Sequence, residues 1–321
     1  MRKTLGYILF FIIQILFLPF GIIGGIIIYY KQIYVSKRLG VSSTAIEIIN
    51  GRWTMDKFGI RNDDATVKLF NTLPNTSSLA HWLVLFPLYL LKLTTGENLI
   101  YPTFKEAKDV GLYNLVISRT IFFDRLIQKS LKHSEQFVLL GAGFDTRCYG
   151  KICERRIKCF ELDKEQTQQL KMNYLHKAGI NTANVHFVPA DFSAENWFDT
   201  LYESGYDKNN VTIFLWEGVT LYLYDEDIRN TLQEIKYNAA PGSVIIADFY
   251  SNKFVHGDML PGKKRLEVTN ESFRFGVDFE RNDSKELTSL VESENLRLEE
   301  VYYMGSRTKY GTWMAVAEIL V

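Results

Sequence analysis

The sequence predicts an α/β domain built on a mostly parallel sheet with helices on both faces, preceded by an apolar N-terminal helix. From residue 136 onward, short apolar runs alternate with longer amphipathic ones, and repeated strand–helix units favour a parallel sheet. The first apolar run ends in Gly141-Ala142-Gly143, a turn typical of domains that bind nucleotide-like ligands. The segment from Leu5 to Tyr30 contains no charged residue, so we expect it to form a separate part of the chain.

Composition excludes some classes of protein. The 321 residues include 37 basic and 37 acidic side chains, so net charge gives no reason to expect a nucleic-acid partner. The three cysteines, Cys148, Cys153 and Cys159, match no common zinc spacing, and the five histidines form no ligand pattern. We therefore expect reduced thiols in a cytosolic compartment and no metal.

The N-terminal apolar segment is long enough to cross a bilayer. As a helix, Leu5–Tyr30 would cover roughly 39 Å, against a hydrocarbon layer of about 30 Å. It is longer than the apolar part of a signal peptide and lacks a small-residue cleavage site. Three basic residues follow it closely and two precede it, which slightly favours a single pass with the catalytic domain in the cytoplasm.

A helical region follows this segment. Two amphipathic helices are predicted between residues 41 and 73, and 103–131 reads as helical because its apolar residues fall largely on one face. The apolar stretch 79–93 is short and contains His81, Pro87 and Lys92. We expect it to be buried or to lie at the membrane interface; the alternative is a second span that forms a hairpin with the first.

The alternating part of the chain supplies the sheet. Strands are predicted at 136–140, 157–161, 185–188, 211–215 and 243–249. Helices are predicted at 164–178, 194–203, 225–238 and near 284–294. Two final apolar-rich runs, 296–304 and 311–319, predict a closing hairpin.

Glycines and acids follow the predicted strands in order. Gly141 and Gly143 follow the first strand, where the missing side chains let the backbone approach a ligand closely. The ends of the next three strands carry acidic residues, namely Glu161 with Asp163, then Asp191, then Glu217. Ligands of open parallel sheets bind at these strand ends, and an acid after the second strand can accept both hydroxyls of a ribose.

The turn after the first strand discriminates between two cofactors. A dinucleotide site prefers a third glycine where this chain has Thr146, and Asp145 would put negative charge near the phosphates. S-adenosylmethionine has no phosphate and carries a sulfonium cation, so acids near the turn do not disfavour it. The turn therefore favours the methyl donor over NAD.

The chain resembles the leucine carboxyl methyltransferase family, and within it the bacterial branch of S-adenosylmethionine-dependent methyltransferases. The motifs that carry the resemblance are "SRTIFFDRL" (118–126), "LLGAGFDTR" (139–147), "FELD" (160–163), "VPADF" (188–192) and "WEGVTLYL" (216–223). The likeness covers residues 41 to 321. It implies a class I methyltransferase, Rossmann-like fold with a seven-stranded sheet whose last strand is antiparallel.

The resemblance also implies roles for individual residues. In the family's pattern Arg119 holds the donor's carboxylate, and Gly141 lines its methionine portion. Asp163 takes the ribose, Asp191 and Phe192 flank the adenine, and Glu217 lies near the amino-acid end. The apolar N-terminal segment is a departure from the soluble phosphatase-modifying members, so their protein substrate is not carried over.

The sequence predicts two parts of the chain with different roles. Residues 1–40 are expected to be a membrane anchor and juxtamembrane linker, and 41–321 a methyltransferase domain with a helical cap (41–131) and an α/β core (132–321). We expect an O-methyltransferase that acts on a carboxylate or hydroxyl of a small or lipid-like acceptor. The catalytic base is left open, with Tyr222, Asp248 and His256 as weak candidates.

Two other functions remain open from the sequence. One is an NAD(P)-dependent oxidoreductase, although the chain lacks a Tyr-x-x-x-Lys pair after the fourth strand. The other is a membrane-tethered scaffold without catalytic activity.

Overall fold

The computed structural model describes residues 2–100, 106–150, 152, 157–192, 197–257, 268–269, 271–279 and 285–321. These residues form two compact units. The first holds the N-terminal helices together with residues 173–180 and 268–269, and the second holds the remainder of the chain.

The second unit contains a mixed sheet. Within the described residues it has seven strands in the order β3-β2-β1-β4-β5-β7-β6. The strands are β1 (Gln136–Leu140), β2 (Lys158–Asp163), β3 (Val185–Pro189), β4 (Thr212–Trp216), β5 (Val244–Tyr250), β6 (Arg297–Met304) and β7 (Met314–Leu320). The first five are parallel, whereas β7 runs antiparallel to both β5 and β6. The predicted fold class, including the antiparallel last strand, is confirmed.

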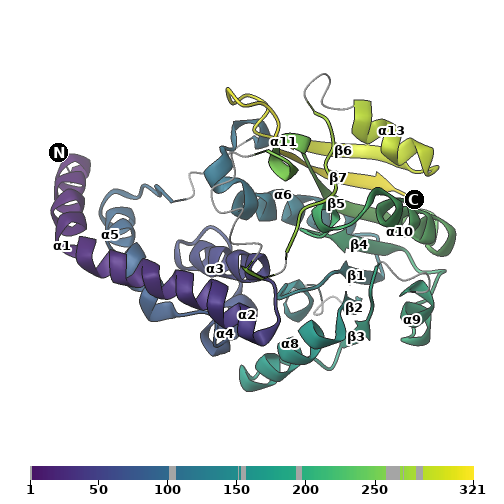
Figure 1. Ribbon diagram of the computed structural model, residues 1–321, viewed down its shortest axis with the longest axis horizontal. Coiled ribbons are helices and arrows are strands. Elements are labelled where there is room, and N and C mark those ends of the chain that lie inside the picture. Colours follow the sequence, from purple (N-terminus) through teal and green to yellow (C-terminus); the bar gives the residue numbers. More distant parts are fainter. Residues whose placement is uncertain are drawn as a thin grey trace. The chain divides into compact units, whose positions relative to one another are not determined.

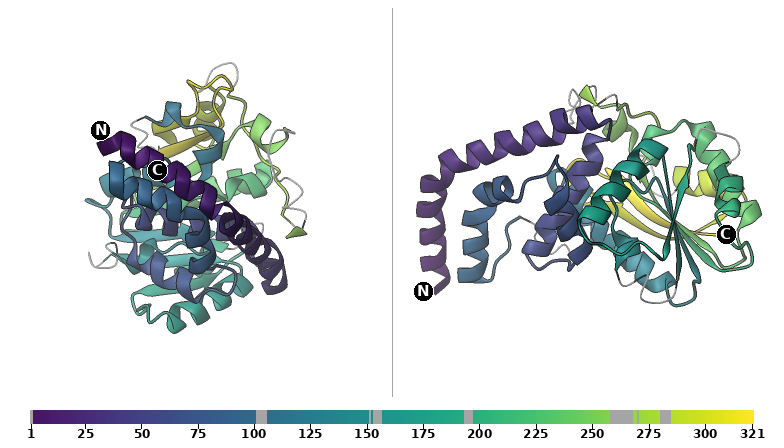
Figure 2. Two further views of the ribbon diagram at one scale, coloured as in Figure 1. Left: turned by 90° about the vertical axis from the view of Figure 1, so that its left-hand side faces the viewer. Right: turned by 90° about the horizontal axis from the view of Figure 1, so that it is seen from below.

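Helices cover both faces of this sheet (Figure 2). On one face, side chains from alternate strand positions pack with α9 (Trp197–Glu203), α10 (Asp225–Asn238) and α13 (Lys285–Ser293) in one buried apolar cluster. On the other face lie α6 (Leu115–Ser130), which contacts β5, β6 and β7, and α8 (Glu165–Lys177), whose Gln168 donates to the carbonyl of Glu161. A short helix, α11 (Asn252–Val255), follows β5.

The helix predicted over 103–131 is only partly correct. Within the described residues, the helix α6 begins at Leu115, and residues 107–109 and 112–114 form separate 3₁₀ turns. The carbonyls of Ala107 and Lys108 accept hydrogen bonds from the backbone of Gly305 and Arg307. Pairing with this distant loop therefore replaces local helix formation. Residues 103–105, and residues 194–196 of the helix predicted at 194–203, lie outside the described residues.

The order of the strands fixes the place of the ligand site. The chain moves outward from β1 through β2 to β3, then returns to pair β4 with the other side of β1. In open α/β sheets, this reversal leaves a crevice at the carboxyl ends of the two central strands. The turns that begin at Gly141 and Glu217 follow β1 and β4 directly, so they lie at that crevice.

The first unit consists of helices. The long helix α1 (Arg2–Tyr30) continues through a π-helical turn (Lys31–Val35) into α2 (Ser36–Leu39), followed by α3 (Ser43–Lys57), α4 (Asp64–Thr72) and α5 (Ser78–Thr95). Ser42, Asp63 and Ser77 cap the last three, each accepting a backbone N–H of its own first turn. The two helices predicted between 41 and 73 are thus present.

Two of these helices, α1 and α5, are long and apolar enough to cross a membrane, judged by length and composition. They pack against each other in antiparallel fashion (Figure 1). Phe17 and Phe86 have ring centroids 5.0 Å apart, and a methyl group added at Gly24 would lie 2.6 Å from the carbonyl oxygen of Ala80. The segment 79–93 therefore packs along α1, with few of its residues fully buried.

We predict opposite outcomes for two adjacent glycines of α1. Gly24→Leu should lower the free energy of unfolding by about 1–3 kcal/mol, because the new side chain collides with the backbone of α5. Gly25→Leu adds the same apolar side chain where nothing lies within 4 Å, so it should be neutral or slightly stabilising. Denaturant unfolding of the detergent-solubilised variants measures the difference; equal stability of the two would contradict the packing.

Candidate functional site

The turn after β1 requires glycine. Gly141 and Gly143 have φ angles of 70° and 44°, in the left-handed region that other residues avoid. A side chain at Gly141 would also collide with Val219. The amides of this turn already have partners: Ala142 N donates to Leu162 O at 2.8 Å, and Gly143 N donates to the carboxylate of Asp163 at 2.6 Å. These two N–H groups are therefore not available to cradle a phosphate.

Asp163 lies at the carboxyl end of β2 beside this turn. One carboxylate oxygen accepts from Gly143 N and the other from Lys164 N at 2.7 Å. Burial raises the pKa of Asp163, and the two backbone N–H groups partly oppose this effect. The contacts fix the carboxylate in place, and each oxygen retains a lone pair for a further donor.

Glu161 does not take the position suggested by its sequence. It lies within β2 with no exposed surface, and one of its oxygens is 2.7 Å from Nζ of Lys171, which is also buried. Burial raises the pKa of Glu161, although the Lys171 charge lowers it in part. Because strand side chains alternate between faces, Glu161 points into the helix-covered face of the sheet. Of the two acids near this strand end, only Asp163 remains a ligand candidate.

The end of β3 contributes one exposed and one buried side chain. Asp191 is exposed, with a carboxylate oxygen 3.9 Å from Nζ of Lys164. The ring of Phe192 is buried and packs edge-on against Trp197, with centroids 5.5 Å apart. Phe192 is thus a fixed apolar surface next to a solvated carboxylate.

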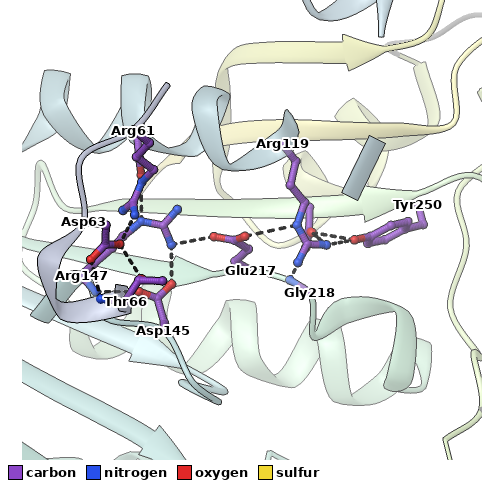
Figure 3. A network of polar contacts seen from close by, with 11 residues as sticks. Arg61, Asp63, Thr66, Arg119, Asp145, Arg147, Glu217, Gly218 and Tyr250 are labelled. Carbon is purple, nitrogen blue, oxygen red and sulfur yellow. Dashed lines mark hydrogen bonds and ion pairs between the residues drawn. The ribbon is translucent and has the colours of Figure 1, made fainter. Parts of the chain in front are cut away.

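Glu217, directly after β4, lies between two arginines (Figure 3). One of its oxygens accepts from Nε of Arg119 at 3.2 Å and the other from Nη1 of Arg147 at 2.7 Å. Arg147 also donates to Asp124 at 2.9 Å and to Asp145. The side chains of Arg119, Glu217 and Arg147 are nearly buried, with exposures of 7% or less.

The guanidinium of Arg119 has further acidic and phenolic neighbours. Its Nη1 is 2.9 Å from the carboxylate of Asp248 and also donates to the hydroxyl of Tyr250. Burial disfavours the charge on Arg119, but Tyr250, Asp248 and Glu217 together hold its pKa above the usual value. Within the described part of the chain, no bonding partner contacts Nη2 of Arg119, which lies against Gly218. One edge of this guanidinium is therefore left for a ligand.

The three weak candidates for a general base differ in their surroundings. Asp248 is fully buried, accepts from Gly218 N at 2.8 Å and pairs with Arg119. These contacts make it part of the support for Arg119. The hydroxyl of Tyr222 is 3.3 Å from the carboxylate of Glu271, and His256 directly follows the short helix α11. No catalytic residue is assigned.

Several residues of this cluster were not predicted from the sequence. Arg147 stood within the quoted glycine motif, but its partner Asp124 lies 23 residues earlier in α6. Tyr250 and Lys171 carried no motif at all. The only available signal was Arg147 itself, a basic residue two positions after Asp145 in the turn, which indicates a buried ion pair.

Thiol and metal chemistry find little support in the described residues. Cys148 and Cys159 are buried thiols, and burial raises the pKa of the Cys148 thiol to about 11. Cys153 lies outside the described residues. No group of three or more potential metal ligands is found in the part of the chain that the structure describes.

The turn after β1 suits a ligand that carries no phosphate. Two of its amides are already bonded within the chain. Beside it, the guanidinium of Arg147 pairs with Asp124, Asp145 and Glu217, and that of Arg119 pairs with Glu217 and Asp248. A pyrophosphate would therefore find few free donors at this turn.

Comparison with known proteins agrees with the resemblance of the motifs. Residues 90–236 match the family described as leucine carboxyl methyltransferase. A relative from Bacillus subtilis is 33% identical over 148 residues, which cover 45% of this chain and 48% of that protein. A relative from Mycobacteroides abscessus is 26% identical over 208 residues, or 64% and 61% of the two chains. Both carry the name "putative S-adenosyl-L-methionine-dependent methyltransferase".

The matched regions are partial. The chain spans about half the length of the Bacillus relative and somewhat more of the Mycobacteroides one. A crystal structure titled "putative methyltransferase" from Thermobifida fusca aligns over 79% of this chain and 91% of that protein. The two sequences are 13% identical, and the TM-score is 0.48. The family resemblance is confirmed over the region that contains β1 to β4.

The buried pair Lys171–Glu161 gives a prediction about the core beside the site. Lys171→Met should lower the free energy of unfolding by about 3–5 kcal/mol, because Glu161 is left as an unpaired buried acid. The double variant Lys171→Met/Glu161→Leu should recover most of this loss, since it removes both charges.

Lys68→Met, which breaks an exposed pair with Asp64, is the matched control and should change little. Urea unfolding monitored by circular dichroism compares the four proteins. A single Lys171 variant as stable as the control would show that the pair is unimportant.

Proposed function

We propose that this chain, whose residues 90–236 match the leucine carboxyl methyltransferase family, binds S-adenosylmethionine at the ends of β1 and β4. In this proposal it transfers the donor's methyl group to an oxygen of a small or lipid-like acceptor. The site residues are Arg119, Gly141, Gly143, Asp163, Asp191, Phe192 and Glu217.

The observation that carries the proposal is the use of the turn's amides by the protein itself. Gly143 N and Ala142 N are both bonded within the chain, so the turn approaches a ligand without offering it a phosphate cradle. This feature favours a donor without a phosphate and disfavours NAD.

Each residue has a role that fits its surroundings. Asp163, held by two backbone N–H groups, would accept the ribose hydroxyls. Phe192 would lie against the adenine ring, and Asp191 would accept from its polar edge. Arg119 would bind the donor's carboxylate through its remaining edge, while Glu217 would attract the amino group.

The chemistry requires alignment more than activation by the protein. Bound S-adenosylmethionine supplies an electrophilic methyl group on a positively charged sulfur. The site would hold this group in line with the acceptor oxygen, an effect of orientation that is worth about 7–11 kcal/mol in favourable systems. A carboxylate acceptor needs no general base because it is already anionic, whereas a hydroxyl acceptor usually needs one.

The membrane is the second part of the proposal. We take residues 1–40 as the anchor and juxtamembrane linker, and 41–321 as the methyltransferase domain, with 41–131 as its helical cap and 132–321 as its core. The domain would face the cytoplasm, because the donor is made and kept there. Attachment through residues 5–30 would bring the domain close to lipid-like acceptors, and α1 exposes many large apolar side chains in keeping with this.

We predict that Asp163→Ala weakens binding of S-adenosylmethionine by about 1–3 kcal/mol, because the ribose hydroxyls lose a charged acceptor. Asp207→Ala, at an exposed position before the amino end of β4, removes the same group at the opposite edge of the parallel strands and should leave affinity unchanged. Titration calorimetry on both folded variants makes the comparison. Equal affinity would remove Asp163 from the site.

The acceptor requires an experiment in cells. Metabolites and lipids from cells with the gene, without it, and with the Asp163→Ala variant are compared for pairs of compounds that differ by one methyl group. We expect the methylated member to be lost without the gene and strongly reduced with the variant. Profiles that are identical in all three strains would argue against methyl transfer in the cell.

A further inference from the structure

We infer that α1 and α5 form a hairpin embedded in one leaflet of a bilayer, so that the chain enters and leaves the membrane on the same side. The partner is the acyl layer of the lipids. This inference replaces the single crossing expected from the sequence. It rests on the proposed membrane attachment and is independent of the proposed methyl transfer.

The first step is the packing of the two helices along the whole length of α5. A side chain at Gly6 would meet Thr95, the rings of Phe17 and Phe86 are in contact, and a side chain at Gly24 would meet Ala80. Small residues at Gly6, Gly21 and Gly24 allow this close approach. Two helices in contact at both ends and in the middle must share one depth in the membrane.

The ends of the pair are also joined by polar contacts. At one end, Lys3 Nζ is 3.0 Å from a carboxylate oxygen of Glu97, and Tyr7 donates to the other oxygen. At the other end, Lys31 Nζ donates to the carbonyls of Pro74 and Thr76 at 2.9 and 2.6 Å. The N-terminus therefore lies with residue 97, and residue 31 with residue 74.

The second step excludes a crossing by both helices. Such a crossing would put residues 31–77 on one side of the membrane and everything from residue 97 onward on the other. However, residues 173–180 and 269 belong to the same compact unit as α3 and α4. The hydroxyls of Ser43 and Thr269 are 3.1 Å apart. A hydrogen bond cannot join groups on opposite sides of a bilayer. Residues 31–77 therefore lie on the same side of the membrane as the chain from residue 97 onward.

The third step excludes a crossing by α1 alone. That arrangement would carry Lys3 to the far side while Glu97 stayed with the catalytic chain, so α5 would have to separate from α1. Separation would break the contacts at Gly6, Phe17 and Gly24 and would expose the polar ends of the pair. With both crossings excluded, a hairpin within one leaflet satisfies all of these contacts.

The surface of α1 fits an acyl layer. One stripe along the helix, Gly6, Phe10, Ile13, Phe17, Gly21, Gly24 and Ile28, is at least half covered. Most of the remaining circumference is apolar and exposed, including Phe11, Ile15 and Leu16 at 61%, 71% and 66%. Lys37 and Arg38 follow α1 in the next helix, where they can contact anionic headgroups. Figure 2 shows that α1 bends, and Pro19 removes one of its backbone hydrogen bonds.

Cysteine accessibility in cells tests the inference. Single cysteines replace Thr4, Lys68 or Tyr237 in the full chain with its three native cysteines changed to alanine; all three positions are exposed. These cysteines report on which side of the membrane three parts of the chain lie: the N-terminus, the helices between α1 and α5, and the chain after residue 97. A membrane-impermeant maleimide is applied to intact cells and to lysed cells, and the protein is assayed in the membrane and soluble fractions.

The inference predicts membrane-bound protein in which all three positions behave alike, with no labelling until the cells are lysed. Labelling of Thr4→Cys alone in intact cells would establish a single crossing, and labelling of Lys68→Cys alone a double crossing; either result overturns the inference. Recovery in the soluble fraction would overturn the lipid partner. Labelling of all three in intact cells would uphold the hairpin and contradict only the cytoplasmic part of the proposed function.

Discussion

The candidate site depends on the burial of Glu217 between Arg119 and Arg147. A buried carboxylate is costly unless it is paired, and here each oxygen has its own guanidinium donor. The same contacts hold both arginines, one against Asp248 and Tyr250, the other against Asp124 and Asp145. The ends of β1, β4 and β5 and the helix α6 are thereby tied together, which fixes the crevice before any ligand arrives.

A second constraint is the conformation of the turn after β1. The positive φ angles of Gly141 and Gly143 direct Gly143 N to Asp163, and this hydrogen bond joins the first two strand ends together with the one from Ala142 N to Leu162 O. Because of this arrangement, Ala142 N and Gly143 N are not available as the donors that a phosphate site would need. The bonded amides disfavour a ligand that carries a phosphate, a distinction that the architecture of the sheet alone would not make.

The parts predicted from the sequence are those with local signals. The strands follow from short apolar runs, the crevice from Gly141 and Gly143, and the apolar helix from its composition. The role of Glu161 was misjudged because the alternation of β2 turns it toward Lys171, which lies on a later helix and carries no motif. The start of α6 and the pairing of α1 with α5 depend on residues about 55 to 200 positions apart. Periodicity within one segment cannot reveal such contacts.

The central claim is that the crevice at β1 and β4 binds S-adenosylmethionine. Titration calorimetry of the purified, detergent-solubilised chain with S-adenosylmethionine and, separately, with NAD tests it most directly. The account predicts saturable binding of S-adenosylmethionine and none of NAD. Binding of NAD, or of neither compound by folded protein, would contradict it.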